Sequence, residues 1–230
     1  MQDLWEYRWL LVRGTGVTLA LGLAGLSVAL VLGLLVAWGR LGGRPWVRAL
    51  AGGYTTFVRS VPDLCMMLLL FYGGQSLLNA LGAATGLWDY IEIDPFAAGA
   101  ITIGLIFGAY TAETFRGAHA SIPRGQGEAA SALGLHRAAA FRRVILPQLL
   151  GYAIPSLGVN WMVLLKTTAL VSVLGLQDIV FYGVSAGRST RNSFAFLLAI
   201  MAIYLLLTAL SELALWRLER RFTRGRLAAR

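Results

Sequence analysis

The chain has 230 residues, of which 57% are hydrophobic and only 13% are charged, and its mean hydropathy is +0.68. Water-soluble domains carry about 25% charged residues, so this composition excludes a soluble globular protein. It also excludes a disordered chain, which needs low hydrophobicity and high charge. A single cysteine, Cys65, excludes an internal disulfide, and two histidines are too few for a histidine-based metal centre. The net charge of +9 suits nucleic acid or a membrane surface, and the positions of the charges decide between them.

Five stretches are long and apolar enough to cross a membrane as helices, which takes about 20 residues each. In chain order they cover about residues 14–39, 61–81, 95–115, 148–172 and 193–215. The first is longer than the core of a signal peptide and follows acidic Asp3 and Glu6, so we expect it to be a retained span. The sequence therefore predicts an all-α membrane protein in which residues 1–230 form a single transmembrane domain.

The fourth span is the least regular, because it contains Pro147, Pro155 and Lys166. Proline removes a backbone donor and crowds the preceding turn. We therefore expect a broken helix here, with a second short helical piece near residues 174–187.

The basic residues alternate along the chain in a way that predicts orientation. The loops after the first and third spans, together with the C-terminal tail, carry 15 arginines, and the N-terminal tail and the other two loops carry four. The tail includes Arg224, Arg226 and Arg230. Because Lys and Arg concentrate on the cytoplasmic side, we expect a periplasmic N-terminus and a cytoplasmic C-terminus. The basicity is then a topology signal and a lipid-headgroup contact, and it requires no nucleic acid.

The longest connection, residues 116–147, has a structured pattern. Glu128 opens an alanine-rich helical run, where a carboxylate meets the positive end of the helix. Gly134 can end that run in a left-handed conformation, and a second helix over residues 137–144 would stop at Pro147. Two short helices joined at Gly134 would form a compact knob outside the membrane. Such a knob suits insertion into a groove of a soluble partner, and an amphipathic helix resting on headgroups is the alternative.

The succession Glu128-Ala129-Ala130, Gly134 and Ile145-x-Pro147 resembles the "EAA" loop of the membrane subunits of ATP-binding-cassette (ABC) importers. The segments GYTTFVRSVPDLCMMLLLFYG (53–73), IDPFAAGAITIGLIFGAYTAETFRGA (93–118) and NWMVLLKTTALVSVLGLQDIV (160–180) are similar to the polar amino-acid permease family. Within that family the chain resembles most the Q-type subunits of histidine/lysine/arginine/ornithine and opine importers. The likeness covers nearly the whole chain and implies the type I importer fold with five core helices.

The resemblance implies a subunit of the bacterial inner membrane that performs no chemistry itself. A second permease, homologous or identical, would complete the pathway, two ATPase subunits would bind ATP and Mg, and a periplasmic protein would deliver the amino acid. The chain has no GxxxxGK[ST] motif, so it is not a P-loop ATPase, and we expect no cofactor in it. The residues implied to couple the ATPase to transport are Glu128, Ala129, Ala130, Gly134, Arg137 and Pro147. Glu128 is expected to bond locally, to a backbone amide or an arginine.

Ionisable groups at membrane depth are costly and mark function by default. Three qualify here: Asp63, Glu113 and Lys166. Each has a purely structural alternative. Asp63 can cap its span or pair with Arg59, Glu113 can pair with Arg116 three residues later, and Lys166 can snorkel or cap carbonyls at the helix break.

Further polar candidates for the substrate path are Asn160 and Tyr110, the latter equally suited to packing. A carboxylate at Asp63, where generic members of the resembled family carry an apolar residue, hints at a cationic substrate. Gly104-x-x-x-Gly108 permits close helix contact, either within the chain or at a permease–permease seam.

Two other functions are compatible with a polytopic membrane protein. An autonomous ion-coupled carrier usually has two related halves with paired broken helices, and the sequence contains one broken span and no repeat. An intramembrane enzyme needs a nucleophile with a base, or metal ligands, inside the spans, and neither histidine lies in a predicted span. Both are disfavoured.

Overall fold

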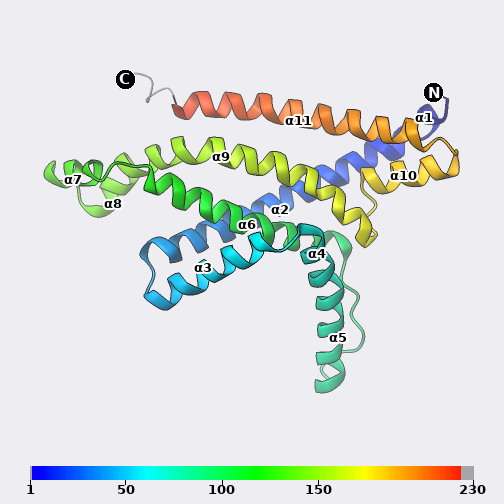
Figure 1. The fold of residues 1–230 in the computed structure, drawn as a ribbon, viewed down its shortest axis with the longest axis horizontal. Helices are drawn as coiled ribbons and strands as arrows, with labels where there is room; N and C mark the ends of the chain where they lie inside the picture. Colours follow the sequence, from blue (N-terminus) through cyan, green and yellow to red (C-terminus); the bar gives the residue numbers. More distant parts are fainter. Residues whose placement is uncertain (1, 224–230) are drawn as a thin grey trace.

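The computed structural model describes residues 2–223, and these residues are all-helical (Figure 1). The helices are α1 (Gln2–Glu6), α2 (Arg8–Gly42), α3 (Pro45–Ser60), α4 (Asp63–Leu68), α5 (Gly74–Thr85), α6 (Pro95–Ala120), α7 (Gly125–Ala132), α8 (Arg137–Ala140), α9 (Leu146–Thr167), α10 (Ile179–Ser189) and α11 (Ser193–Thr223). A π-helical turn joins α4 to α5 and another joins α8 to α9, while a 3₁₀ segment, Thr168–Leu174, extends α9. The predicted tail residues Arg224, Arg226 and Arg230 lie outside the described residues.

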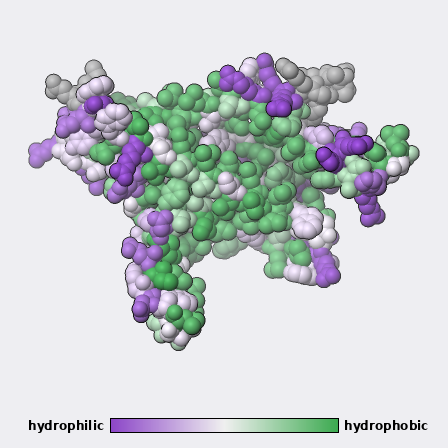
Figure 2. Space-filling view, turned by 180° about the vertical axis from the view of Figure 1, so that it is seen from behind, coloured by the Kyte–Doolittle hydropathy of each residue, from purple (hydrophilic) through white to green (hydrophobic). Residues whose placement is uncertain are grey.

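Within the described residues, five helical stretches are long and apolar enough to cross a membrane. They are Arg8–Gly42, Asp63–Thr85, Pro95–Ala120, Arg137–Leu174 and Ser193–Phe222, and each contains or overlaps one of the stretches predicted from the sequence. The space-filling view shows an apolar belt across the middle of the molecule with hydrophilic residues gathered at both ends (Figure 2). In Figure 1, α1 and α10 lie at one end of the molecule, and α7 and α8 lie at the other.

The fourth span is broken, as expected, and the break lies just after Lys166 and not at the prolines. Helix α9 continues through Pro155, and the backbone leaves the α-helical form only after Thr167, becoming 3₁₀ up to Leu174 and left-handed at Gly175 (φ 90°). Proline is tolerated inside a membrane-spanning helix when neighbouring helices, polar side chains or local changes of helix geometry satisfy the backbone groups that it leaves without a hydrogen bond. The expected second short piece is present as α10.

Pro147 also does not end a helix. The residues before it, Phe141–Ile145, form a π-helical turn that runs directly into α9. A π turn opens the hydrogen-bond ladder by one residue, which makes room for the proline ring, a common site of helix distortion. The helix that starts at Arg137 is therefore continuous with the fourth span, and the connection outside the bundle is shorter than residues 116–147.

The core is a close pairing of α2 with α6 made possible by glycines on both helices. A Cβ atom added at Gly25 would lie 2.6 Å from Ile103, and one added at Gly104 would lie 2.3 Å from Val28. Gly108 likewise faces α2. The predicted close contact at Gly104 and Gly108 is thus made within the chain.

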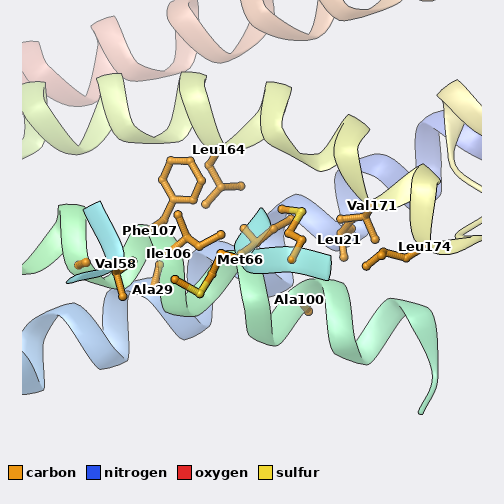
Figure 3. Close-up of a cluster of buried hydrophobic side chains, with 13 residues drawn as sticks. Leu21, Ala29, Val58, Met66, Ala100, Ile106, Phe107, Leu164, Val171 and Leu174 are labelled. Carbon is orange, nitrogen blue, oxygen red and sulfur yellow. The ribbon is translucent and has the colours of Figure 1, made fainter. Parts of the chain in front are cut away.

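Around this pairing, apolar side chains from several helices form one buried cluster (Figure 3). Phe107 and Ile106 of α6 meet Leu164 of α9, and Met66 of α4 packs into the same cluster. Helix α3, which lies in what the sequence presented as a charged loop, joins the bundle through Val58.

Helix α5 leaves this bundle and projects away from it (Figure 1). The chain returns along α5 through residues 86–94, and polar side chains form hydrogen bonds between α5 and this returning segment. Asn79 exchanges hydrogen bonds with the backbone of Ile91, Gln75 accepts one from the Ile93 amide, and the Trp88 indole donates to the Leu78 carbonyl. The arm, residues 74–94, is therefore a built structural unit, although α5 projects away from the long helices of the bundle (Figure 1).

Candidate functional site

At one end of the molecule, α7 and α8 with the turn between them form a knob, residues 125–140 (Figure 1). Gly134 is left-handed (φ 76°), and the amides of Gly134 and Leu135 donate to the carbonyls of Ser131 and Ala130, at 3.0 and 3.1 Å. This pattern is a Schellman motif, in which a left-handed glycine closes a helix. The structure thus contains the helix stop predicted at Gly134.

The predicted coupling residues differ in exposure. Ala130 is buried at the base of the knob, and the others are exposed: Glu128, Ala129, Gly134, Arg137 and Pro147. Gln148 of α9 donates to the side chain of Gln126 at 3.2 Å, which ties α7 to the fourth span. A displacement of the knob would therefore be transmitted to α9.

The local bond expected for Glu128 is absent among the residues that the structure describes, and this carboxylate faces solvent. Sequence reasoning also passed over Leu133, whose side chain is 81% exposed at the turn of the knob. The available signal was a leucine placed directly before Gly134, the residue predicted to end the helix. An apolar side chain held in solvent on a rigid turn is suited to insertion into a partner.

Three of the predicted pathway residues come together in one cavity of about 380 Å³ between α3, α6 and α9. They are Tyr110, Glu113 and Asn160, and the wall also includes Arg59, Thr114, Ser121, Tyr152 and Ser156. Asn160 donates to the Thr114 hydroxyl at 3.1 Å. A second cavity of about 390 Å³ shares Arg59, Tyr110 and Glu113 with the first.

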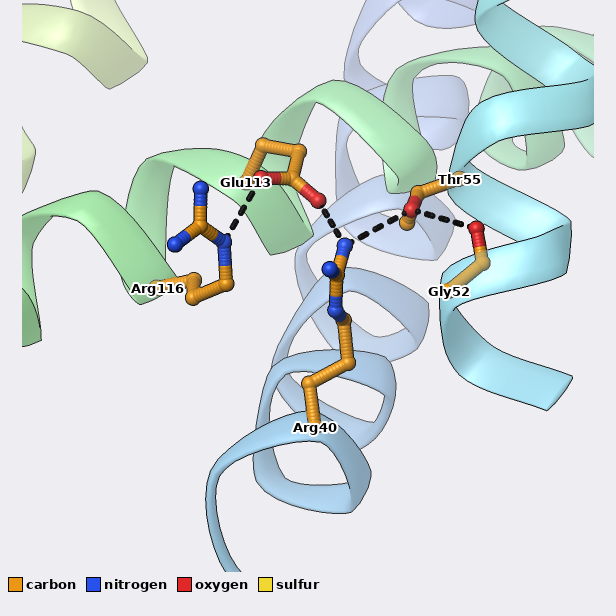
Figure 4. Close-up of polar contacts among 5 residues, drawn as sticks. All are labelled: Arg40, Gly52, Thr55, Glu113 and Arg116. Carbon is orange, nitrogen blue, oxygen red and sulfur yellow. Dashed lines mark hydrogen bonds and ion pairs between the residues drawn. The ribbon is translucent and has the colours of Figure 1, made fainter. Parts of the chain in front are cut away.

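Glu113 is held by arginines from two helices (Figure 4). The predicted partner Arg116 donates from Nε to Oε2 at 2.8 Å. The other oxygen is bonded by Arg40, at the end of α2, which also donates to the Thr55 hydroxyl of α3 at 2.9 Å. This cluster joins α2, α3 and α6, and it leaves neither oxygen of Glu113 without a partner.

The other two predicted pathway residues do not line this cavity. Asp63 is the first residue of α4 and is half-buried, but it makes no side-chain cap hydrogen bond. The expected pair with Arg59 is not formed, because the guanidinium of Arg59 lies over the ring of Tyr110, 5.4 Å from its centroid. Lys166 is exposed on the last turn of α9.

Asp178 is a buried polar residue that sequence reasoning did not single out. Its side chain is inaccessible to solvent, and Oδ1 accepts a hydrogen bond from the Phe181 amide at the start of α10, at 2.8 Å. Oδ2 has no hydrogen-bond partner among the described residues. Burial raises the pKa of Asp178 to about 6.

No group of three or more His, Cys, Asp or Glu side chains within residues 2–223 is arranged to hold a metal ion. The geometry instead combines an apolar belt, a polar cavity beside it and an exposed knob. These features suit passage of a polar solute and contact with a soluble partner.

Comparisons with known proteins identify this combination. The family model described as "Binding-protein-dependent transport system inner membrane component" matches residues 29–224. The chain is 45% identical over 222 residues to the histidine/lysine/arginine/ornithine transport system permease protein HisQ of Escherichia coli (strain K12), covering 96% of this chain and 97% of the relative. It is 36% identical to the octopine transport system permease protein OccQ of Rhizobium radiobacter, covering 97% of this chain and 93% of the relative.

Solved structures share the fold. A crystal structure of an amino acid ABC transporter with histidines matches with a TM-score of 0.82 and 29% identity, over 96% of this chain and 97% of the other. An inward-facing MetNI methionine ABC transporter matches with a TM-score of 0.72 at 21% identity, over 95% and 98%, which supports the fold alone. The chain therefore belongs to the multi-pass inner-membrane permease components of binding-protein-dependent ABC transport systems, which are non-catalytic subunits.

Proposed function

We propose that this chain forms one half of the membrane pathway of an ATP-driven importer for basic amino acids, among them histidine, arginine, lysine and ornithine, or for opines. The support for the substrate class comes from the names of its relatives, which include HisQ, OccQ and the arginine permease ArtQ of Escherichia coli, 34% identical. The family implies an ATPase and a binding protein as partners. ATP and Mg belong to the ATPase, and this chain needs no cofactor of its own.

The orientation follows from the positive-inside rule, with the N-terminus in the periplasm and the C-terminus in the cytoplasm. In that orientation α7 and α8 face the cytoplasm, where the ATPase is. The connection after the second span, residues 86–94, then faces the periplasm, and no Lys or Arg occurs between Arg59 and Arg116, as expected of a segment on that side.

The knob is the proposed attachment to the ATPase, and the single observation that carries this proposal is its rigid exposed turn. Leu133 and the left-handed Gly134 stand at the free end of α7, and the bond between Gln126 and Gln148 links α7 to a spanning helix. ATP-driven closure of the ATPase pair would move the knob, and with it α9, between two arrangements of the pathway. Glu128, Ala129, Ala130, Arg137 and Pro147 are assigned to the same coupling element.

The test is to replace Leu133 with Asp, or Gly134 with Val, and to reconstitute the complete complex in proteoliposomes with the binding protein. Leu133→Asp puts a charge where an apolar contact is proposed, and Gly134→Val forces a β-branched residue into a left-handed conformation, at a cost of about 1–2 kcal/mol. We expect either variant to abolish co-purification with the ATPase or to reduce ATP-dependent uptake at least several-fold.

The matched control is Ala132→Ser, an exposed change of similar size on the last turn of α7, which should keep both properties. Uptake by the Leu133→Asp complex at the wild-type rate would contradict the proposed attachment. Uptake by vesicles that contain no ATPase would contradict the importer proposal as a whole.

A second permease, homologous or identical to this chain, is the proposed occupant of the space beside α5. The arm exposes Leu77 (63%), Leu81 (48%) and Leu87 (75%), although its internal hydrogen bonds hold it in shape. An apolar, preformed element that projects away from the bundle of residues 2–223 is consistent with a pathway built from two subunits.

The cavity that contains Tyr110, Glu113 and Asn160 is the proposed polar part of the pathway. Asp63 and Lys166 remain candidates for other points along it. A chain without two related halves is not the architecture of a secondary carrier with inverted repeats, so the ion-coupled alternative has no support from the fold.

A further inference from the structure

We propose that Arg59 binds the carboxylate group that every transported amino acid carries, at the cavity between α3, α6 and α9. This inference rests on the proposed function, because it takes that cavity as part of the substrate pathway. In this proposal the cavity recognises the carboxylate group that the substrates share, and it does not recognise their basic side chains.

The charges around the cavity argue against the opposite assignment. Glu113 is the acidic residue of the cavity wall, and each of its two oxygens is already bonded to an arginine, Arg40 or Arg116. A carboxylate shared by two guanidinium groups has little attraction left for a cationic side chain. This cluster is positive overall, so the cavity favours an anionic group.

Arg59 is the arginine of this wall that no carboxylate neutralises. Among the described residues its guanidinium makes no hydrogen bond and no ion pair, and it makes a cation–π contact with Tyr110, 5.4 Å from the ring centroid. Stacking orients the planar group but uses none of its N–H donors. Arg59 is exposed, and a guanidinium on a cavity wall with free donors is suited to bidentate binding of a carboxylate.

The position of Arg59 fits this role. It lies in the last turn of α3 and lines both cavities, of about 380 and 390 Å³, so it stands where the two meet. The first cavity falls within the range of about 300–1,000 Å³ typical of small-molecule pockets. Apart from Glu113, its other wall groups, including Thr114, Ser156 and Asn160, are neutral and suit the remaining polar atoms of an amino acid.

The test places a reporter in the cavity of the assembled complex. In a Cys65→Ser background, Ser156→Cys puts a thiol in the cavity wall, and its modification by an anionic and by a cationic methanethiosulfonate reagent is timed. We expect the anionic reagent to react several-fold faster than the cationic one. Arg59→Gln should reduce this ratio several-fold, and Arg48→Gln, on the same helix but outside the cavity wall, should leave it unchanged.

Ligand protection then identifies the group that Arg59 binds. L-Arginine should slow the modification of Ser156→Cys, whereas agmatine, which is arginine without its carboxylate, should not. Histidine and histamine should differ in the same way. Arg59→Gln should abolish protection by both amino acids equally, and Arg59→Lys, which keeps the charge but loses the fork of donors, should retain part of it.

Equal protection by arginine and agmatine, or protection that survives Arg59→Gln, would overturn this inference. So would a charge ratio that does not respond to Arg59. These results leave ATP-dependent uptake by the parent complex untouched, whereas failure of the proposed function would appear as uptake without an ATPase.

Discussion

Asp178 is buried by a helix that is distant in the sequence, so its burial cannot be predicted from the residues next to it. It lies in the connection between Leu174 and α10, where an acid is ordinarily a solvated loop residue or a helix cap. The cap is present, in the bond from the Phe181 amide to Oδ1. Its burial comes from distant chain, because Thr18 of α2 accepts a hydrogen bond from the Ile179 amide and brings α2 over the cap.

Replacing Asp178 with Asn should therefore stabilise the protein at neutral pH. The folded-state pKa of about 6 is higher than the ordinary value of 3.8, so above pH 6 the folded protein must hold a buried charge. As the pH falls from 6 towards 4, the folded state takes up a proton and this penalty is lost. Asparagine keeps the cap oxygen and carries no charge at either pH.

We expect the melting temperature of the Asp178→Asn complex in detergent to exceed that of the wild type by a few degrees at pH 7.5, and the difference to shrink at pH 5. Asp89→Asn, an exposed change in the arm, serves as the control and should show no such trend. A difference that stays the same at both pH values would mean that Asp178 is not buried as a charge.

Only one of the two ion pairs of Glu113 could be predicted from the local sequence. Its pair with Arg116 follows from helical spacing, since residues three apart lie on one face, and the structure contains that pair. Arg40 is 73 positions away in the chain, and nothing in the spacing connects it to Glu113. The same limit applies to Arg59, whose nearest acid in sequence is Asp63 but whose observed partner is the ring of Tyr110.

At the scale of helices, the pairing of α2 with α6 depends on glycines that leave no room for a side chain. At Gly104 an added Cβ would lie 2.3 Å from the side chain of Val28, which is closer than packed atoms can approach. Small residues at such crossings bring helix backbones together in membranes, where packing drives association. Gly104→Val should therefore separate the two helices.

The measurement is yield and monodispersity of the purified complex by size-exclusion chromatography. We expect Gly104→Val to give mostly aggregated or degraded protein. Gly16→Val, on α2 where an added Cβ meets nothing within 4 Å, should purify like the wild type. Normal behaviour of both variants would show that the α2–α6 contact is not required.

The number and order of the spans could be predicted from the sequence because the membrane requirement for about 20 apolar residues is strict. Irregular backbone could not be placed in the same way. A break in the fourth span was predicted from Pro147, Pro155 and Lys166, but the spacing did not say at which of them it falls. Helix α9 passes Pro155 without interruption, and the 3₁₀ segment begins at Thr168, two residues after Lys166. The projecting arm was also hidden, since its apolar residues read like those of any span and only packing distinguishes it.

At the scale of the whole molecule, the unequal distribution of charge allows the proposed orientation to be tested directly. Trp46, at the start of α3, is 60% exposed, and Leu87, on the arm, is 75% exposed. They lie in connections that the arginine count assigns to opposite sides, the cytoplasm for Trp46 and the periplasm for Leu87. In a Cys65→Ser background, an impermeant maleimide added to intact spheroplasts should label Leu87→Cys and leave Trp46→Cys unmodified. After permeabilisation both should react at similar rates, because both positions are exposed to solvent. The reverse pattern would invert the chain in the membrane and place the knob on the side where no ATPase could reach it.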